Sequence, residues 1–352
     1  YNHIYFIPYS AMGAELSTDY DERTIIAKAR VTMGWLAGMA MPAIGFALIF
    51  QSKDGVDGRL LQSNYIDYGI LSAVLAGVTA VFCVWGTRSV IPRLPQGDTT
   101  GARFSVRQPF KDLQIAFSNR NFRLSTGAGL AFGIAAGVYT TLSLYMGTYF
   151  WELSSDQLAG MVVPTALATL LAFIVLGRIG QRYDKPTMLT AACIVMAINA
   201  FALIGARLLG FMPANGQPAV YILVLLSTGI AVLTIVTLQV VTVSILADLL
   251  DEQELHTRRR QEGVFFAASA FVMKATTGLG AMLAGIVIDV VGLTPGAEPG
   301  TIEPSVLQSL GWFSIIPTVG MAIIAAWFFH RIHMTRENLV RIKQELAKRA
   351  IS

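Results

Sequence analysis

Lys274 is the only charged residue between positions 263 and 288 of the chain. If this apolar stretch crosses a membrane, the ammonium group lies near the bilayer midplane, at a cost of about 2.5–3.5 kcal/mol on insertion scales. A charge at that depth usually faces a bundle interior or a water-filled cavity, where a partner compensates it. Its three donors suit a carboxylate, a phosphate or sugar hydroxyls. We therefore interpret Lys274 as a binding-site residue, with a structural ion pair between helices as the alternative.

Uncharged polar residues interrupt other apolar stretches at comparable depth. They are Asn2, Tyr145, Gln239 and Ser269. Polar side chains inside a membrane either line a functional cavity or form hydrogen bonds between helices, which are worth about 0.6 kcal/mol on average. We predict that these residues contribute to the same site as Lys274, and interhelical hydrogen bonding is the alternative.

The composition supports the membrane interpretation. The chain has 54% hydrophobic and 14% charged residues, whereas soluble domains carry about 25% charged residues. A spanning helix needs roughly 17–25 mostly apolar residues, and eight segments qualify: 30–50, 67–86, 124–150, 157–177, 186–208, 219–247, 263–288 and 308–330. Residues 1–12 have the composition of the end of a ninth span. We predict an all-α, multi-pass protein of the cell membrane, which in a bacterium is the cytoplasmic membrane.

Several classes of function lack the residues that they need. The sequence contains no G-x-x-x-x-G-K-[ST] phosphate loop, no G-x-S-x-G elbow and no H-E-x-x-H pair. Cys83 and Cys193 lie in different apolar segments, where packing explains them better than metal or redox chemistry. We therefore expect neither an enzyme nor a resident cofactor or metal. The net charge of +4 comes from membrane-flanking loops, so we expect no nucleic-acid partner.

The positive charges indicate which ends of the spans face the cytoplasm. Twenty-two of the 26 lysine and arginine residues lie in alternate loops, within 23–30, 88–123, 178–185, 258–260 and 331–349. The intervening loops hold only Lys53, Arg59 and Arg207. Because cytoplasmic loops carry the excess of lysine and arginine in membrane proteins, the first set of loops is predicted to be cytoplasmic.

Two acidic cytoplasmic segments resemble each other. The first is AELSTDYDERT at 14–24, and the second is ADLLDEQELHT at 247–257. Each is predicted to be a turn between an inward-running and an outward-running helix, and six spans separate corresponding helices. Two parallel six-helix halves produce such an internal sequence repeat, although chance similarity is the alternative. Because the chain begins without methionine inside an apolar helix, we expect three earlier spans, so that this chain holds helix 4 (in part) to helix 12.

Twelve helices in two halves with a long basic loop between them describe the major-facilitator fold. On this interpretation, residues 1–86 end the N-terminal half with helices 4–6, and 87–123 form the cytoplasmic loop between the halves. Residues 124–330 form the C-terminal half with helices 7–12, and 331–352 form a cytoplasmic tail. In such folds the substrate site lies near the midplane between the halves, which places Lys274 at mid-depth in helix 11.

The charged residues of the acidic segments are candidates for a cytoplasmic gate, in which ion pairs between the halves close the inner side. They are Asp19, Glu22, Arg23, Asp248, Asp251, Glu254 and Arg260. The alternative is that they are solvated loop ends.

Two further patterns predict packing surfaces. Gly129, Gly133 and Gly137 recur every four residues, and small residues at this spacing let helices approach closely. In the basic tail, apolar residues recur at near-helical spacing: Ile332, Leu339, Ile342 and Leu346. The tail is therefore predicted to be an amphipathic helix along the inner membrane face, with a solvated helix as the alternative.

Two motifs resemble the glycoside–pentoside–hexuronide:cation symporter family of the major facilitator superfamily. The first is IPYSAMGAEL at residues 7–16, followed by the first acidic segment. The second is D-x-x-E-L-x-T-x-x-R-x-E-G-x-F-F at 251–266, followed by Lys274. A weaker similarity, to the superfamily's loop between helices 8 and 9, lies in GRIGQRYD at 177–184. The resemblance covers essentially the whole chain.

This resemblance implies a secondary transporter that moves a sugar, glycoside or hexuronide together with a cation by alternating access. In the melibiose-type members the helix 11 lysine lies at the sugar and cation region, and Lys274 matches it. Arg30 is the nearest match, offset by one residue, to a helix 5 arginine that holds sugar hydroxyls; snorkelling to the cytoplasm is its alternative role. The helix 10 aromatic residue that stacks on the sugar falls on Gln239.

The residues at the family's cation site depart from its pattern. The helix 4 aspartate falls on Phe6, and a nearby helix 4 hydroxyl falls on His3. Hard cations such as Na⁺ need several oxygen ligands, whereas histidine exchanges protons near neutral pH. We therefore expect coupling to H⁺, or no coupling, at least as readily as coupling to Na⁺, and a hydrogen-bonded interior histidine is the alternative role for His3.

Two other functions stay open. A lysophospholipid-carrying branch of the superfamily has a helix 11 lysine in a similar Phe-Phe…Lys…Gly context, with a later aspartate like Asp289, so an amphiphile carrier is the second hypothesis. A membrane sensor that binds without transporting is the third. The expected partners are a small-molecule sugar or glycoside and the lipid bilayer, and we expect a monomer.

Overall fold

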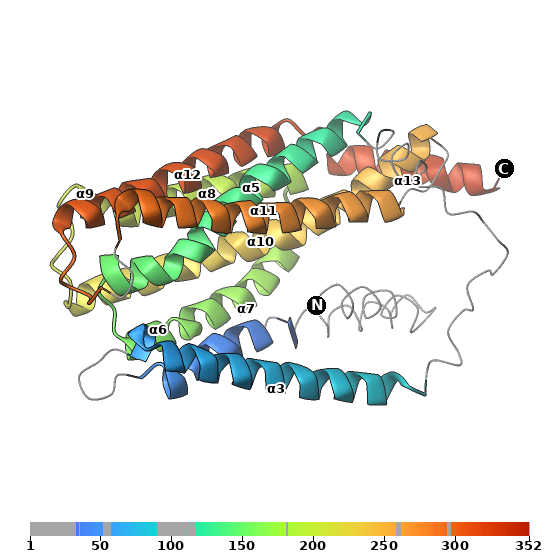
Figure 1. The fold of residues 1–352 in the computed structure, drawn as a ribbon. Helices are drawn as coiled ribbons and strands as arrows, with labels where there is room; N and C mark the ends of the chain where they lie inside the picture. The colour runs from blue at the N-terminus through green and yellow to red at the C-terminus, as the bar shows by residue number, and fades with distance from the viewer. Residues whose placement is uncertain are drawn as a thin grey trace. The chain divides into compact units, whose positions relative to one another are not determined.

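The computed structural model describes residues 33–34, 36–51, 58–89, 114, 117–180, 182–257, 262–293 and 297–351. The regular elements among these residues are all helical (Figure 1). The chain divides into two compact units, of which the smaller comprises Tyr1–Phe104 with Ser155–Val162 and the larger comprises Ser105–Ser154 with Val163–Ser352.

The described elements of the smaller unit include η1 (Gly45–Ile49), η2 (Gly58–Leu60), α3 (Gln62–Thr87) and α6 (Ser155–Gly160). The larger unit begins with α5 (Arg120–Tyr145), η4 (Met146–Phe150), α7 (Val162–Ile179) and α8 (Lys185–Ala200). It continues with η5 (Phe201–Gly205), α9 (Ala206–Leu208), α10 (Pro218–Thr257), α11 (Glu262–Val291), α12 (Pro304–His330) and α13 (Arg336–Ile351).

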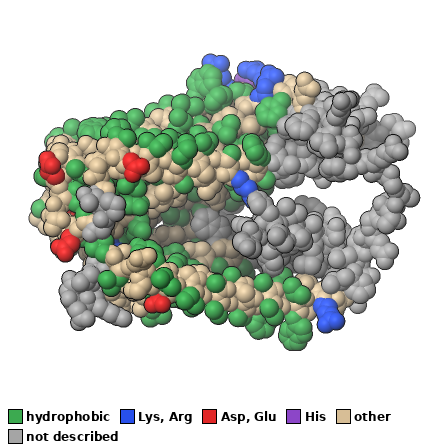
Figure 2. All heavy atoms as spheres, viewed as in Figure 1, with side chains coloured by type: hydrophobic (Ala, Val, Ile, Leu, Met, Phe, Trp, Pro, Cys, Tyr) green, Lys and Arg blue, Asp and Glu red, His purple; other side chains and the backbone are tan. Residues whose placement is uncertain are grey.

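The described helices include seven segments that are long and apolar enough to cross a membrane. They are Gln62–Thr87, Arg120–Phe150, Ser155–Leu176, Lys185–Leu208, Pro218–Leu255, Ser269–Val291 and Pro304–His330. They confirm seven of the eight predicted spans. The remaining one, at 30–50, is described in part, as the shorter apolar helix Leu36–Ile49. Figure 2 shows hydrophobic side chains along the flanks of the helices, as lipid-facing surfaces require.

Local sequence signals set the ends of α5 and α11. Asn119 caps α5, because its side-chain oxygen accepts a hydrogen bond from the amide of Phe122 at 3.1 Å. Gly292 ends α11 with a φ of 74°, which glycine adopts without strain. The amide of Leu293 then donates to the carbonyl of Ile288 at 3.2 Å, which completes a Schellman cap.

The long helices of the larger unit alternate in direction. Lys185 of α8 pairs with Asp248 of α10 at one end, and Asn199 of α8 donates to the carbonyl of Ser227 of α10 at 3.0 Å toward the other, so these helices are antiparallel. This alternation is what successive membrane crossings require.

Helices α5 and α12 are antiparallel as well. The ring of Phe328 lies against Gly127 near the start of α5, and Ser314 Oγ donates to Met146 Sδ at 3.4 Å just beyond its end. An apolar core joins these two helices to α8 and α10. Its fully buried large side chains include Phe122, Leu189, Leu238, Ile245, Leu249 and Phe329. Other buried side chains, among them Leu142, Val220 and Leu310, lie toward the opposite ends of these helices, so the larger unit is packed along their length.

Glycines bring α5 and α11 into backbone contact. A Cβ added to Gly280 would lie 2.6 Å from the Cα of Gly137, and one added to Gly133 would lie 2.3 Å from Thr276 Oγ1. The two contacts keep the same sequence offset, so α5 and α11 run parallel and in register. The predicted glycine packing face of α5 is thereby confirmed.

Gly280→Ala is expected to destabilise the protein by about 1–3 kcal/mol, because the backbone of Gly137 cannot move aside as a flexible side chain could. Gly278→Ala is the matched control on the same helix, since a Cβ there meets nothing within 4 Å. Thermal unfolding in detergent should show a lower midpoint for Gly280→Ala, and an unchanged or higher one for Gly278→Ala. Equal midpoints for the two variants would show that the helices are not in contact at Gly280.

The cytoplasmic end of α10 corrects one prediction. Residues 247–257 are predicted above to form a turn, but they continue α10 as a helix to Thr257. A helix of 40 residues is about 60 Å long, roughly twice the hydrocarbon thickness of a bilayer. Part of α10 therefore extends beyond the length that spans a bilayer, and charged residues are compatible with a helix there.

The tail confirms one part of its prediction and corrects another. It forms the helix α13, as expected from the spacing of its apolar residues. However, Ile342 is buried in the core of the larger unit, and Leu346 packs against that core. The apolar face of α13 is thus covered by protein rather than laid on the membrane, because the projecting end of α10 offers it an apolar surface.

Candidate functional site

Lys274 lies near the middle of α11 on the side turned away from α5. Helix α11 meets α5 through Thr276 and Gly280, and a step of two residues rotates a helix by about 200°. Lys274 is accordingly exposed, as are its neighbours Phe271 and Met273. Since a lysine at this depth is costly in lipid, we expect its side of α11 to border protein or water.

The register of α5 on α11 gives the depth of Tyr145. Because Gly133 lies level with Thr276, Lys274 is level with Ala131 of α5. Tyr145 is fourteen residues further along the same helix, which is about 21 Å nearer the outer side. Tyr145 is half-buried and stacks on Tyr149, with ring centroids 6.4 Å apart. The prediction that Tyr145 shares the depth of Lys274 is corrected by this register.

Gln239 does share the depth of Lys274. Two hydrogen bonds tie α5 to the antiparallel α10: one joins Tyr139 to Thr228, and the other joins Asn121 Nδ2 to Glu252 Oε1 at 3.0 Å. When residues are counted along both helices from either hydrogen bond, the position of α10 that is level with Lys274 lies within about three residues of Gln239. This separation is about 5 Å along the helix axis. The Gln239 side chain is exposed, so its amide is accessible at that level.

The other predicted binding residues divide into two groups. Ser269 is half-buried on α11, five residues before Lys274, which places it about 7.5 Å nearer the cytoplasm and rotates it by about 140°. The rest of the predicted site and gate lies outside the described residues: Asn2, His3, Asp19, Glu22, Arg23, Arg30 and Arg260.

Asp248 forms an ion pair within the larger unit. Its carboxylate contacts the ammonium of Lys185 at the start of α8, and the same ammonium donates to the carbonyl of Ser244 at 3.3 Å. The side chain of Asp248 is 9% exposed and that of Lys185 is 31% exposed. Within the larger unit Asp248 thus pairs with α8, and its predicted ion pair between the halves stays a prediction. Asp251 and Glu254, further along α10, are half-buried, and their gate role stays a prediction.

A second polar network surrounds Glu252. Its carboxylate accepts hydrogen bonds from Asn121 Nδ2 at 3.0 and 3.2 Å and from Asn119 Nδ2 at 3.2 Å. Asn119 also donates to Gln253 Oε1 at 3.3 Å, and Asn121 Oδ1 accepts from the backbone amide of His333 at 3.3 Å. The network therefore joins the start of α5, the end of α10 and the connection between α12 and α13.

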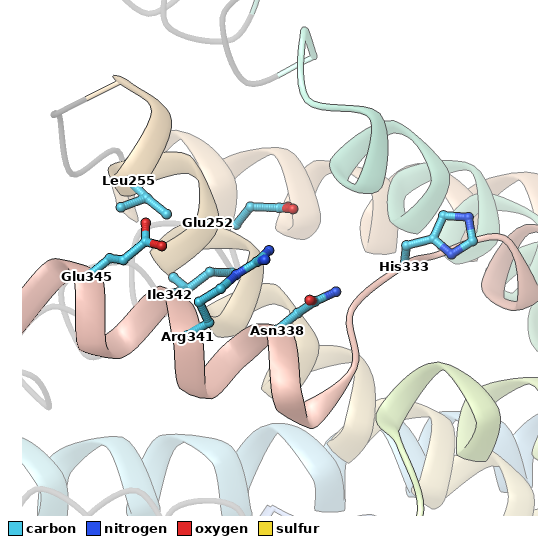
Figure 3. Close-up of a pocket in the computed structure, with 7 residues that line it drawn as sticks. All are labelled: Glu252, Leu255, His333, Asn338, Arg341, Ile342 and Glu345. Carbon is cyan, nitrogen blue, oxygen red and sulfur yellow. The ribbon is translucent and has the colours of Figure 1, made fainter.

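A cavity of about 240 Å³ lies beside this network, between α10 and α13 (Figure 3). It is lined by Glu252, Leu255, His333, Asn338, Arg341, Ile342 and Glu345. Figure 3 shows Glu252 entering from α10 and Arg341 from α13, so the lining carries both signs of charge. Among the residues that the structure describes, no three His, Cys, Asp or Glu side chains come together as a metal site requires.

Lys185, Asn119, Asn121 and Glu252 were not among the predicted gate residues, although each contributes to these networks. One signal was available in the sequence, because an asparagine before a helical run, as at Asn119, is typical of a helix N-cap. The partners of these side chains are distant in the chain, and a single sequence does not pair them.

Seven helices long and apolar enough to cross a membrane, one of them with a lysine near its middle, are features of a multi-pass membrane protein. Residues 2–336 match the family described as MFS/sugar transport protein. The chain belongs to this family. The match confirms both the resemblance carried by the two sequence motifs and the predicted major-facilitator fold.

Known proteins with significant similarity are named as symporters. The uncharacterized symporter sll1374 of Synechocystis sp. is 24% identical over 243 residues, which cover 68% of this chain and 43% of that protein. The inner membrane symporter YicJ of Escherichia coli K12 is 23% identical over 345 residues, which cover 97% of this chain and 69% of that protein. The chain thus spans less than half the length of the first relative.

Proposed function

We propose that this chain belongs to a secondary active transporter that moves a sugar, glycoside or hexuronide across the membrane by alternating access, coupled to H⁺ or Na⁺. The observation that carries the proposal is Lys274, a charged side chain near the middle of α11, on the face turned away from α5. Membership in the MFS/sugar transport family and similarity to proteins named symporters support it.

Lys274 and Gln239 together have the chemistry that a sugar requires. The ammonium donates to hydroxyls or pairs with the carboxylate of a hexuronide, and the amide of Gln239 both donates and accepts. The two residues come from different helices at the same depth. A polar ligand between them would recover hydrogen bonds that it loses on leaving water, and hydrogen bonds to a charged group are the stronger ones.

An amphiphile carrier of the same superfamily is the second candidate. It is favoured by Gln239, which stands where melibiose-type carriers have an aromatic residue, and by Asp289, which is exposed near the end of α11. Uptake measured in parallel with a labelled disaccharide, a labelled glucuronide and a labelled lysophospholipid separates the two, because each candidate predicts a different substrate.

Uptake is expected to respond to a pH gradient more than to a sodium gradient, because Phe6 offers no oxygen ligand and His3 offers a nitrogen. The full-length protein in liposomes should take up the labelled disaccharide or glucuronide faster when the outside is acid than when only sodium is raised there. An ionophore that collapses the pH gradient, added to the same liposomes, provides the control. Strict dependence on sodium would contradict this assignment.

A further inference from the structure

Hydrogen bonds hold α13 and the segment before it against neighbouring cytoplasmic elements. The backbone amide of Arg336, at the start of α13, donates to Asp184 Oδ1 at 3.0 Å, and its guanidinium donates to the carbonyl of Gly180. Just before α13, the amide of His333 donates to Asn121 Oδ1 at 3.3 Å. The tail is therefore fixed to the loop before α8 and to the start of α5.

Apolar side chains anchor the same segment. Ile332 is 4% exposed, Met334 is 3% exposed and Ile342 is 5% exposed, and all three belong to the core that contains Leu249 of α10. Burying side chains of this size is worth about 1.5–3 kcal/mol each. The docked position of α13 is thus supported by packing as well as by hydrogen bonds.

The end of α10 needs such support. Beyond Asp248 α10 continues for about nine residues, and a short helical end is marginally stable unless it packs against something. Leu249 and Leu250 of this end are buried in the core, and Leu255 packs against it. Glu252 is the polar anchor of this end, because Asn119 and Asn121 both donate to its carboxylate. On the other side of the cavity stands α13, which contributes Arg341 (Figure 3).

Anchoring Glu252 also fixes the rotation of this helical end. Successive residues of a helix are about 100° apart. Asp251 and Glu254 are therefore rotated by roughly 100° and 160° from Glu252. Any change that frees Glu252 lets these two carboxylates turn or fray with the end of the helix.

We propose that α13 is a strap that sets the position of the acidic end of α10, with Asn121 and Glu252 as positioning residues. The strap presents Asp251 and Glu254 in one orientation, in which they can form and release the ion pairs of the cytoplasmic gate. The effect on the cytoplasmic gate rests on the proposed transport function, whereas the docking of α13 does not. The docking holds together elements of the larger unit alone.

Hydrogen–deuterium exchange of the full-length protein tests the docking. Asn121→Ala leaves the Glu252 carboxylate with fewer donors and removes the acceptor for His333, so amides of α13 and of residues 249–257 should exchange about tenfold faster. Ile342→Ala removes apolar contacts between α13 and the core without changing the hydrogen bonds of Asn121, and it should also speed exchange of these amides. Val340→Ala, on the exposed face of α13, is the matched control and should leave exchange unchanged. Unchanged exchange in both Asn121→Ala and Ile342→Ala would overturn the strap.

Transport kinetics then test the positioning role. Asn121→Ala should lower the maximal uptake rate at least about fivefold, the lower range of coupling between distant sites, while the substrate affinity measured by direct binding stays the same. Faster exchange with an unchanged uptake rate would overturn the positioning role. If the wild-type protein transports none of the labelled substrates, the transport function fails, and the exchange experiment still decides the strap because it needs no transport.

Discussion

Lys274→Ala is expected to abolish transport while the protein stays folded in the membrane. Hydrogen bonds to a charged group are worth about 1.5–3 kcal/mol, so loss of the ammonium should weaken substrate binding roughly ten- to hundredfold and remove the charge available for coupling. The fold should tolerate the change, because Lys274 is exposed on α11 and lies away from its contact with α5. Removing a charge from this depth also favours membrane insertion. Initial uptake rates and the unfolding midpoint, measured on one preparation, check both parts.

Two further variants show whether the position or only the charge of Lys274 matters. Lys274→Arg keeps the charge but replaces the compact ammonium with a planar group, so it should retain only part of the uptake. Lys348→Ala removes an exposed cation from α13 and should leave uptake unchanged. Normal uptake by Lys274→Ala would refute the assignment of Lys274 to the site.

Lys185→Ala is expected to destabilise the protein by about 3–5 kcal/mol, because it removes the cation that is paired with a largely buried carboxylate. The carboxylate of Asp248 would stay in a site where it is 9% exposed. Asp248→Ala should cost less, because the Lys185 side chain is 31% exposed and can turn toward water. The asymmetry follows from burial, and thermal or denaturant unfolding in one detergent measures it.

A double variant completes this test. Lys185→Met with Asp248→Leu removes both charges and keeps apolar volume, so it should recover most of the stability lost in Lys185→Ala. This recovery of stability is expected if the role of the ion pair is to hold α8 against α10. If Lys185→Ala were as stable as the wild-type protein but slow in transport, the pair would belong to the gate instead.

The spans could be predicted from the sequence because membrane crossing depends on local composition. A run of about twenty apolar residues is recognisable without knowing its neighbours, and the loop charges orient it. For the same reason the isolation of Lys274 within α11 was evident from sequence alone. The glycine repeat of α5 was equally local, and its partner surface, Thr276 and Gly280, appears only in the structure.

What the sequence could not provide was the pairing of distant residues. Glu252 is separated from Asn121 by most of the C-terminal half, so nothing in its acidic neighbourhood indicates an amide partner. Acidic residues also fit a turn or a solvated helix equally well, so the composition of residues 247–257 does not distinguish the predicted turn from the helix that forms. The depth of Tyr145 relative to Lys274 depends on the register between α5 and α11, which the composition of an apolar stretch does not provide.

Counterflow in liposomes most directly tests the central claim that Lys274 lies in the substrate site of a carrier. Liposomes with the full-length protein are loaded with an unlabelled disaccharide or glucuronide, and the labelled form is added outside without any ion gradient. The wild-type protein should accumulate label transiently, and Lys274→Ala, equally folded and reconstituted, should accumulate none. Substrate binding by the wild-type protein without counterflow, or counterflow by Lys274→Ala at the wild-type rate, would contradict the claim.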